Sequence, residues 1–291
     1  MKDQRRSCEA SAPQATILGG HGFIGQALHS RLTHLGWSVW VPERQHLWPE
    51  AERALGHVFY CAGLTADYLQ RPADTAHAHI CLLNQVLQSA RYTSLVYLSS
   101  TRVYDALAGH VRQATEEMSL PVQPSNPRHL YDLSKLAGEA LCHALGAGRA
   151  RVARLSCVYQ ETKEATGFLP DLLRLVSSST TRIELDSSPY YVRDYIHLDD
   201  VLRALIDIAV QGRQATYNVA SGANVSNAEL AAYIHQVSGK QLHFLQHAQG
   251  EPGPVADITR LADEFGWRPE PVQARIYRYL LGLTHAENGS Y

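Results

Sequence analysis

The sequence predicts an α/β protein, a doubly wound parallel sheet with a smaller α/β lobe toward the C-terminus. Apolar runs of four to five residues alternate with helical stretches of ten or more, which is typical of strand–helix–strand units. A glycine-rich turn joins the first apolar run to the first helical stretch. With 291 residues and 45% hydrophobic content, the chain is long enough for one large domain and a companion.

The first half of the chain supplies the sheet. Its apolar runs are rich in aliphatic and aromatic residues, and the stretches between them are long enough for crossover helices. We predict strands at 15–18, 38–41, 57–62, 94–100 and 151–156, and helices at 23–35, 74–91 and 131–146. Only thirteen residues separate Glu43 from the strand at 57, enough for a short helix in WPEAERAL but not for a strand with its crossover helix. We therefore expect the third strand to be missing or vestigial.

From about residue 160 the alternation is looser, which indicates a smaller lobe interleaved with the sheet domain. We predict helices at 168–178, 199–211, 226–238 and 258–265, and strands at 183–185, 216–220 and 241–246. The sheet domain would then comprise 15–160 with roughly 190–212 interleaved, and the lobe 161–189 with 213–283. We expect residues 1–14 and 284–291 to be flexible tails.

Composition excludes several classes of protein. The net charge is −2 without a basic patch, so we expect no nucleic-acid partner. No apolar run approaches the ~18 residues that span a bilayer, and the N-terminal segment lacks the apolar core of a signal peptide. The five cysteines are scattered and never form CxxC, which fits reduced thiols in the cytoplasm. The histidines do not resemble a closed zinc site, so we expect no metal.

The glycine-rich turn GGHGFIG has the sequence context of a Rossmann-type dinucleotide-binding loop. Gly19, Gly22 and Gly25 follow an apolar strand and begin an amphipathic helix, whose N-terminus would face a pyrophosphate. Glu43, eighteen residues after Gly25 and at the end of the second strand, can accept hydrogen bonds from ribose hydroxyls. Arg44 follows it and could meet a 2′-phosphate. We expect NAD as the cofactor, with NADP possible; a purely structural turn is the alternative.

A second set of polar residues follows the strand at 94–100. Ser100 and Thr101 end that strand at the carboxyl edge of the sheet, where open α/β sheets bind ligands. About thirty residues later, Tyr131 and Lys135 are spaced to share one helix face. The Tyr131–Lys135 spacing alone fits an ordinary helix surface equally well. The Ser100 hydroxyl and the glycine-rich turn are the features that favour a catalytic pair.

Several motifs in order resemble the extended short-chain dehydrogenase/reductase superfamily, in its sugar-nucleotide epimerase/dehydratase branch. GGHGFIG is similar to the branch's GxxGxxG loop, and YDLSKLAGE matches YxxSKxxxE. LSSTRVYD resembles SSxxVYG, CAGLT the stretch lining the nicotinamide, RLSCVYQ the RxSNVYG segment, and VRDYIHLDDV a segment that begins with the same Arg-Asp pair. YNVASGANVSNAEL and ADITRLADEFGWRPEP resemble its C-terminal lobe. The resemblance covers nearly the whole chain.

The resemblance implies a role for each matching residue. Tyr131 would be the catalytic acid or base, its pKa lowered by the Lys135 ammonium and the nicotinamide ring; Lys135 would also hold the nicotinamide ribose, and Ser100 would orient the substrate oxygen. The implied cofactor-binding residues are Gly19, Gly22, Phe23, Ile24, Gly25, Glu43, Arg44, Cys61, Ala62, Gly63, Tyr131 and Lys135. The implied substrate-binding residues are Thr65, Thr101, Cys157 and Arg193. A homodimer is also implied; the helix at 74–91 is apolar enough to form its contact, and burial of that helix within the monomer is the alternative.

Departures from the branch narrow the function. Thr101 and Arg102 stand where its dehydratases carry Asp-Glu, which disfavours dehydration. Cys157 and His79 replace asparagines, and residues 246–253 lack the arginine that contacts a nucleotide diphosphate. The sequence therefore indicates an NAD(P)-dependent epimerase or keto-sugar reductase acting on a sugar, probably nucleotide-linked. The alternatives are a dehydrogenase or reductase of a non-sugar hydroxyl compound, and a non-catalytic dinucleotide-binding sensor.

Overall fold

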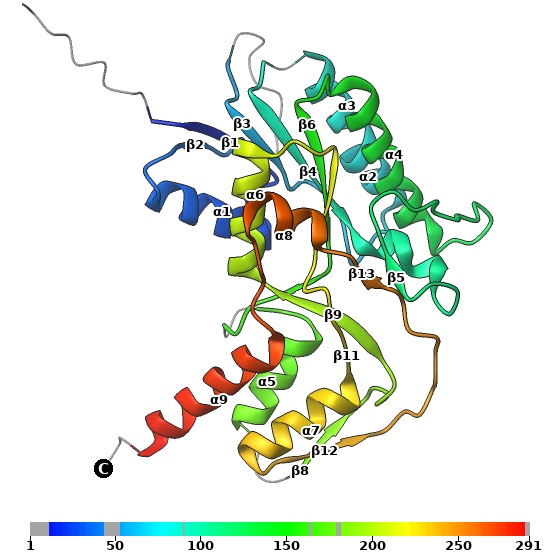
Figure 1. Ribbon diagram of the computed structural model, residues 1–291, viewed down its shortest axis with the longest axis vertical. Coiled ribbons are helices and arrows are strands. Elements are labelled where there is room, and N and C mark those ends of the chain that lie inside the picture. Colours follow the sequence, from blue (N-terminus) through cyan, green and yellow to red (C-terminus); the bar gives the residue numbers. More distant parts are fainter. Residues whose placement is uncertain (1–11, 44–52, 90, 163–164, 179–181, 289–291) are drawn as a thin grey trace, which may run out of the picture.

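The computed structural model describes residues 12–43, 53–89, 91–162, 165–178 and 182–288 (Figure 1). A parallel sheet flanked by helices forms one end of the molecule, and a smaller lobe forms the other. Among the described residues, no helix is long and apolar enough to cross a membrane.

Six parallel strands form the main sheet, in the order β10-β6-β4-β3-β1-β2. They are β1 (Gln14–Leu18), β2 (Ser38–Trp40), β3 (His57–Tyr60), β4 (Ser94–Ser100), β6 (Ala150–Leu155) and β10 (Thr216–Val219). In sequence the chain moves outward to β2, returns beside β1 to form β3, and then continues to β10. This reversal of strand order confirms the predicted doubly wound α/β fold and leaves a ligand site at the carboxyl ends of β1 and β3.

β2 ends the sheet on one side. Its three residues pair with β1, and among the described residues no strand pairs with its other edge. Residues 44–52, which include Arg44 and most of the short helix expected in WPEAERAL, lie outside the described residues. In the described part of the chain, the position of a third strand is therefore unfilled.

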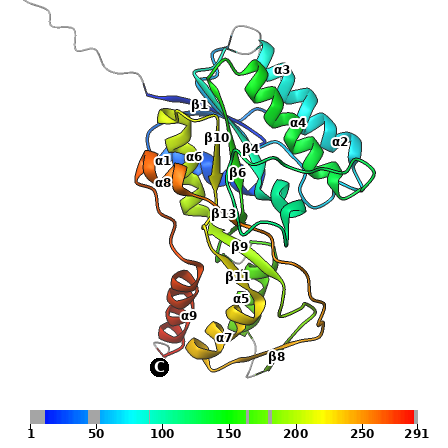
Figure 2. The same cartoon turned by 45° about the vertical axis from the view of Figure 1, so that its right-hand side comes forward.

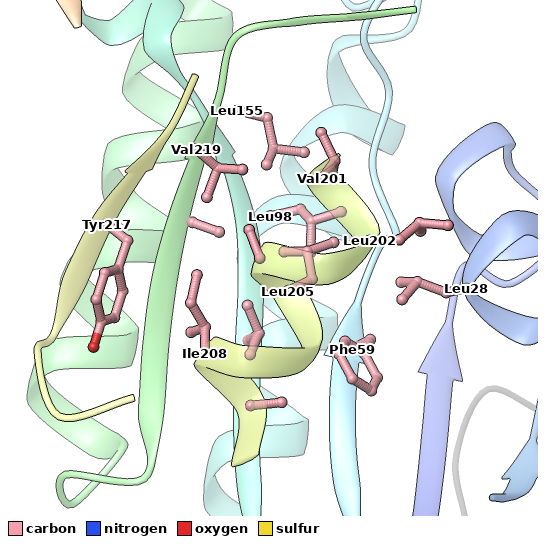
Figure 3. Close-up of a cluster of buried hydrophobic side chains, with 14 of the residues drawn as sticks. Leu28, Phe59, Leu98, Leu155, Val201, Leu202, Leu205, Ile208, Tyr217 and Val219 are labelled. Carbon is pink, nitrogen blue, oxygen red and sulfur yellow. The ribbon is translucent and has the colours of Figure 1, made fainter. Parts of the chain in front are cut away.

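Helices cover both faces of the sheet (Figure 2). On one face lie α1 (Phe23–His34), α6 (Leu198–Gln211) and α8 (Thr259–Phe265). Figure 3 shows α6 lying over the sheet, with Leu202 and Leu205 among side chains from β4, β6 and β10. On the other face lie α2 (Pro72–Ala76), a π-helical turn (His77–Cys81), α3 (Leu82–Ser89) and α4 (His129–Leu145).

The helix predicted at 74–91 corresponds to residues 72–89, in which the π-helical turn directly joins α2 to α3. Its apolar residues Leu82, Leu83, Val86 and Leu87 are buried in the core of the monomer. Close packing against α4 depends on Gly138, because a Cβ there would lie 2.5 Å from the Tyr97 hydroxyl and 2.9 Å from the His79 carbonyl oxygen. The apolar character of this helix is thus explained by packing within the chain.

The lobe is built from small sheets and three helices around its own core. Its elements are β7 (Cys157–Tyr159), α5 (Phe168–Ser178), β8 (Arg182–Leu185), β9 (Val192–His197), β11 (Asn224–Ser226), α7 (Asn227–Ser238), β12 (Gln241–Phe244) and α9 (Val272–Asn288). β11, β9 and β7 form one sheet, and β12 pairs with β8. A 3-10 helix (Thr101–Leu107) follows β4, and β5 (Gln113–Ala114) pairs with β13 (Val255–Ala256) near the sheet domain.

The observed units differ from the expected division of the chain. β10 and α8 pack with the main sheet, although we had placed residues 213–283 in the lobe. Of residues 190–212, α6 covers the sheet, whereas β9 joins the lobe. The helix α9 continues to Asn288, past the expected boundary at 283, and Gln14 already belongs to β1. A short strand after a helix does not reveal from its own sequence which sheet it will join.

Candidate active site

A cavity of about 430 Å³ lies where the carboxyl ends of the sheet strands meet the lobe. Residues from β4, α4, β7 and β9 all line it, so both parts of the molecule contribute. It brings together these sequence-predicted residues: Phe23, Ile24, Cys61, Gly63, Thr65, Ser100, Thr101, Tyr131, Lys135, Cys157 and Arg193.

The glycine turn has the geometry that a pyrophosphate requires. Gly19 has a φ of +82°, and a Cβ there would lie 2.6 Å from the Ala62 nitrogen. A Cβ on Gly25 would lie 2.5 Å from the Gly19 carbonyl oxygen, whereas one on Gly22 would meet nothing closer than 3.4 Å. Gly22 is the N-cap of α1, without a side-chain cap and without an acidic residue in the first turn. The helix N-terminus is therefore suited to an anion, as a dinucleotide cofactor needs.

Glu43 lies beside this turn. Its carboxylate is 3.7 Å from the His21 Nε2, and both side chains are largely exposed. His21 was not singled out in the sequence, because a residue between two glycines of the loop carries no distinctive signal. The position of Glu43 next to the glycine turn fits contact with the adenosine ribose.

Tyr131 is only 2% exposed and has polar neighbours on several sides. Burial raises the pKa of its phenol above the ordinary value, while hydrogen bonding with Ser100, the charge of Arg102 and hydrogen bonding with Thr65 lower it. Because burial dominates, the phenol is protonated at neutral pH. The Ser100 and Thr65 hydroxyls thus come together with Tyr131 as the catalytic hypothesis requires.

Lys135 lies one turn further along α4 and is 6% exposed. Its Nζ donates a hydrogen bond of 2.9 Å to the Leu98 carbonyl oxygen and lies 5.8 Å from the centroid of the Tyr131 ring. Burial lowers the pKa of Lys135 to about 8, although the carboxylate of Glu139 and the Cys61 side chain raise it. Burial also raises the pKa of the Cys61 thiol to about 12, so Cys61 lines the cavity as a neutral group.

Arg102 is a site residue whose role the sequence did not reveal. Its guanidinium carbon lies 4.5 Å from the centroid of the Tyr131 ring and 5.3 Å from that of Tyr68. We had expected Lys135 to supply the positive charge beside the phenol, and in the structure Arg102 is the cation that lowers the Tyr131 pKa. The sequence signal was the replacement of an expected carboxylate by arginine, which we used only to disfavour dehydration.

His79 lies behind the catalytic pair, on the π-turn. It is fully buried, its Nδ1 is 2.8 Å from the Ser134 hydroxyl, and its ring packs edge-on against Tyr131. Its Nε2 has no hydrogen-bond partner among the described residues, and a Cβ on Gly63 would lie 2.6 Å from it. Burial lowers the pKa of His79 to about 3, and the charge of Lys135 acts in the same direction. A neutral imidazole therefore supports the tyrosine.

A buried ionic network fixes α4, the helix that carries Tyr131 and Lys135, to the sheet. The Arg154 guanidinium on β6 pairs with the Glu139 carboxylate on α4 at 2.7 Å, and both side chains are nearly inaccessible. Glu139 also accepts a hydrogen bond of 2.5 Å from Ser99. Arg154 donates to the Tyr104 hydroxyl, which donates to Asn218 on β10. The last residue of this chain's YxxSKxxxE motif thus has a structural role, since Glu139 orients α4.

The far side of the cavity belongs to the lobe. Cys157 lines it from β7 and Arg193 from β9, together with Gly253 and Pro254 from the loop before β13. The Arg193 guanidinium stacks on the Tyr191 ring at 3.9 Å, and its Nη1 donates a hydrogen bond of 3.0 Å to the Val192 carbonyl oxygen. Its charge also lowers the pKa of Asp105. The described residues contain no cluster of three potential metal ligands.

Fold and site together define an NAD(P)-dependent enzyme of the extended short-chain dehydrogenase/reductase type. The chain belongs to the NAD dependent epimerase/dehydratase family, whose model matches residues 15–220. This confirms the predicted family, and the comparisons below confirm the fold class and the cofactor class.

Similar proteins include enzymes that act on nucleotide-linked sugars. GDP-6-deoxy-D-mannose reductase from Pseudomonas aeruginosa is 27% identical over 91% of this chain and 95% of its own length. dTDP-glucose 4,6-dehydratase from Streptomyces griseus is 28% identical over 60% of this chain, and the match spans only 54% of that enzyme. The structure of RMD from Pseudomonas aeruginosa complexed with NADPH has a TM-score of 0.71 and 26% identity, covering 93% of this chain and 99% of that one. MoeE5 in complex with UDP-glucuronic acid and NAD has a TM-score of 0.72, covers 94% of this chain and 99% of its own, and at 21% identity supports the fold alone.

Proposed function

We propose that this protein reduces a keto group on a nucleotide-linked sugar, with NADH or NADPH as the hydride donor. The observation that carries the proposal is the buried Tyr131, which is protonated at neutral pH and faces a cavity together with Ser100. A protonated phenol is the form that donates a proton to a carbonyl oxygen. Similarity to a nucleotide-sugar reductase along nearly its whole length supports the same reaction.

Each residue has a definite task in this proposal. When bound, a reduced nicotinamide cofactor would supply the hydride. Ser100 donates a hydrogen bond that orients the keto oxygen, and Tyr131 gives up its phenolic proton to that oxygen, so that a C–O–H group forms as the Tyr131 O–H bond breaks. Lys135 would hold the ribose hydroxyls of the nicotinamide half of the cofactor. The first turn of α1 would bind the pyrophosphate, and Glu43 would bind the adenosine ribose.

The lobe side of the cavity would receive the nucleotide diphosphate. Arg193 would bind a phosphate there, which is supported by its place in the lining of the cavity together with Cys157 and Thr101. Thr101 and Arg102, where a dehydratase would carry acidic residues, leave no carboxylate at those positions for eliminating water. We expect a cytoplasmic homodimer. Because the apolar side of the helical segment 72–89 is buried within the chain, any dimer contact on this segment would have to use its exposed, polar side.

Turnover of nucleotide keto sugars tests the proposal. GDP-, dTDP- and UDP-linked keto sugars are mixed with NADH or NADPH, and the loss of reduced cofactor is followed by absorbance while the sugar product is identified by mass. Stoichiometric oxidation with a gain of two hydrogens in the sugar is expected. Isomerised sugar without net cofactor loss would instead identify an epimerase. Turnover only of non-sugar ketones would overturn the substrate class, and tight cofactor binding without turnover would favour a sensor.

A further inference from the structure

The guanidinium of Arg102 lies against the face of the catalytic tyrosine. The guanidinium carbon is 4.5 Å from the centroid of the Tyr131 ring, a distance at which a cation is attracted to an aromatic face. Arg102 also donates a hydrogen bond of 3.5 Å to the Tyr68 hydroxyl, and its Nε lies 3.9 Å from the Asp105 carboxylate. These contacts hold the charge beside the phenol.

Lys135 is less suited to this electrostatic role. Its Nζ is 5.8 Å from the Tyr131 ring centroid and already donates to the Leu98 carbonyl oxygen. Its pKa of about 8, lowered by burial, means that part of its charge is lost in mildly alkaline solution. A guanidinium keeps its charge throughout that range.

We propose that Arg102 is a further catalytic residue, whose guanidinium stabilises the Tyr131 phenolate that forms when the phenolic proton passes to the substrate oxygen. This inference rests on the proposed function and adds to it the group that carries the developing charge. The Tyr131 ring whose centroid lies 4.5 Å from the guanidinium carbon carries the developing negative charge, and a cation beside it in a cavity of lowered dielectric stabilises that charge more strongly than water does.

Other charged and titratable groups also face Tyr131. Asp132 on α4 raises the pKa of the phenol, and His79 on the π-turn is neutral. Asp105 lies near Arg102 on the 3-10 helix, and Lys135 lies along α4. Arg102 is nearer the Tyr131 ring than Lys135 is. Removing its charge would leave the negative charges of Asp132 and Asp105 without the positive charge that now opposes them. We therefore expect a higher phenol pKa in its absence.

The test measures the ionisation of Tyr131 directly. Difluorotyrosine is incorporated at position 131 to bring the phenol titration into the range of the folded protein, and fluorine NMR follows it against pH in the full chain with cofactor bound. We expect Arg102→Met to raise the pKa of this group by about one unit, and Arg102→Lys to raise it less. Arg193→Met, which removes a cation from the same cavity away from Tyr131, should leave the titration unchanged.

Two outcomes would overturn the proposal. One is an unchanged titration in Arg102→Met with folding verified by circular dichroism; the other is an equal shift in Arg193→Met. If Arg102→Met does not fold, Arg102→Gln, which also removes the charge but keeps a polar side chain, decides in the same way. The titration is read without substrate, so failure to turn over keto sugars would contradict the proposed function without affecting this measurement.

Discussion

The Tyr131 side chain meets neighbours from three separate segments of the chain. Ser100 comes from the end of β4, Thr65 from the loop after β3, and Arg102 from the 3-10 helix. The phenol itself is held by α4. Its acidity is therefore a property of the folded arrangement, and single substitutions should separate proton transfer from cofactor binding.

Replacing Tyr131 or Lys135 should affect different steps. Tyr131→Phe removes the transferable proton and should lower kcat by about 10²–10⁴-fold while leaving cofactor affinity nearly unchanged. Lys135→Met should weaken NADH or NADPH binding as well as slow turnover, because it removes the ribose ligand. Steady-state kinetics and cofactor fluorescence titration measure the two effects, with exposed Arg203→Met as the control. Full activity in Lys135→Met would contradict the mechanism.

His79 should make the protein sensitive to acid. The pKa of this histidine is lowered to about 3 in the folded state, whereas an unfolded chain protonates it near pH 6.5. Its contribution to stability is therefore present above about pH 6.5 and is lost as the pH falls from there toward 3, at about 1.4 kcal/mol per pH unit.

The substitution His79→Asn should flatten this dependence. The difference in unfolding free energy between pH 7 and pH 5, measured with urea, should shrink by about 2 kcal/mol relative to wild type. The same substitution at exposed His110 serves as the control and should leave the difference unchanged. Parallel pH dependences for wild type and His79→Asn would show that His79 is not the group responsible.

At the residue scale, sequence reasoning located the cluster but not its electrostatics. Eleven predicted residues line one cavity because strand ends and helix faces follow from periodicity. Arg102 and His79 could be seen only as departures from a motif. The direction of a side chain across a cavity depends on packing between distant segments, which a single sequence does not display.

Among the elements, the glycine turn should separate folding from binding. Gly25→Ala places a methyl group 2.5 Å from a backbone oxygen and should destabilise the fold by about 1–3 kcal/mol or more. A Cβ at position 22 would lie no closer than 3.4 Å to any other atom, so the Gly22→Ala variant should still fold. Its affinity for the cofactor should fall by about tenfold. Thermal unfolding and fluorescence titration give the two readouts. Wild-type affinity in Gly22→Ala would argue against pyrophosphate binding at this turn.

The α4–β6 ion pair should dominate the stability of the catalytic helix. Glu139→Gln leaves the Arg154 charge buried without its partner and should cost about 3–5 kcal/mol in unfolding free energy. The double variant Glu139→Gln with Arg154→Met should recover part of that loss, because no uncompensated charge remains. Chemical denaturation of both variants measures this. Equal stability of Glu139→Gln and wild type would mean that the pair is not buried in solution.

The long helices were predictable, whereas of the short strands some were predicted, such as those at 183–185 and 216–220, and others were missed. Helices such as 168–178 were placed correctly because an amphipathic pattern over several turns is a strong signal. β7, β9 and β11 were missed, since three to six residues carry too little periodicity and their pairing joins segments far apart in sequence. The π-turn at 77–81 likewise has no sequence signature, although it brings His79 against α4.

At the scale of the whole molecule, the sheet domain depends on the second half of the chain. α6 buries the apolar side chains of β4 and β6, and β10 completes the sheet (Figure 3). A chain ending at residue 160 would expose that face and should show no cooperative thermal transition, in contrast to the full chain. Near-ultraviolet circular dichroism during heating measures it. A sharp transition in the shortened chain would show that the first half folds alone.

Asn218 links the orientation of α4 to a segment that is synthesised late. Its side chain, fully buried on β10, accepts the hydrogen bond that ends the series Glu139–Arg154–Tyr104. On the ribosome, the segment carrying Tyr131 emerges long before Asn218 does. The catalytic helix can form early as a local structure, but its final orientation must wait until that asparagine has been synthesised. A chaperone that protects nascent chains would therefore meet this protein with its reaction centre still unassembled.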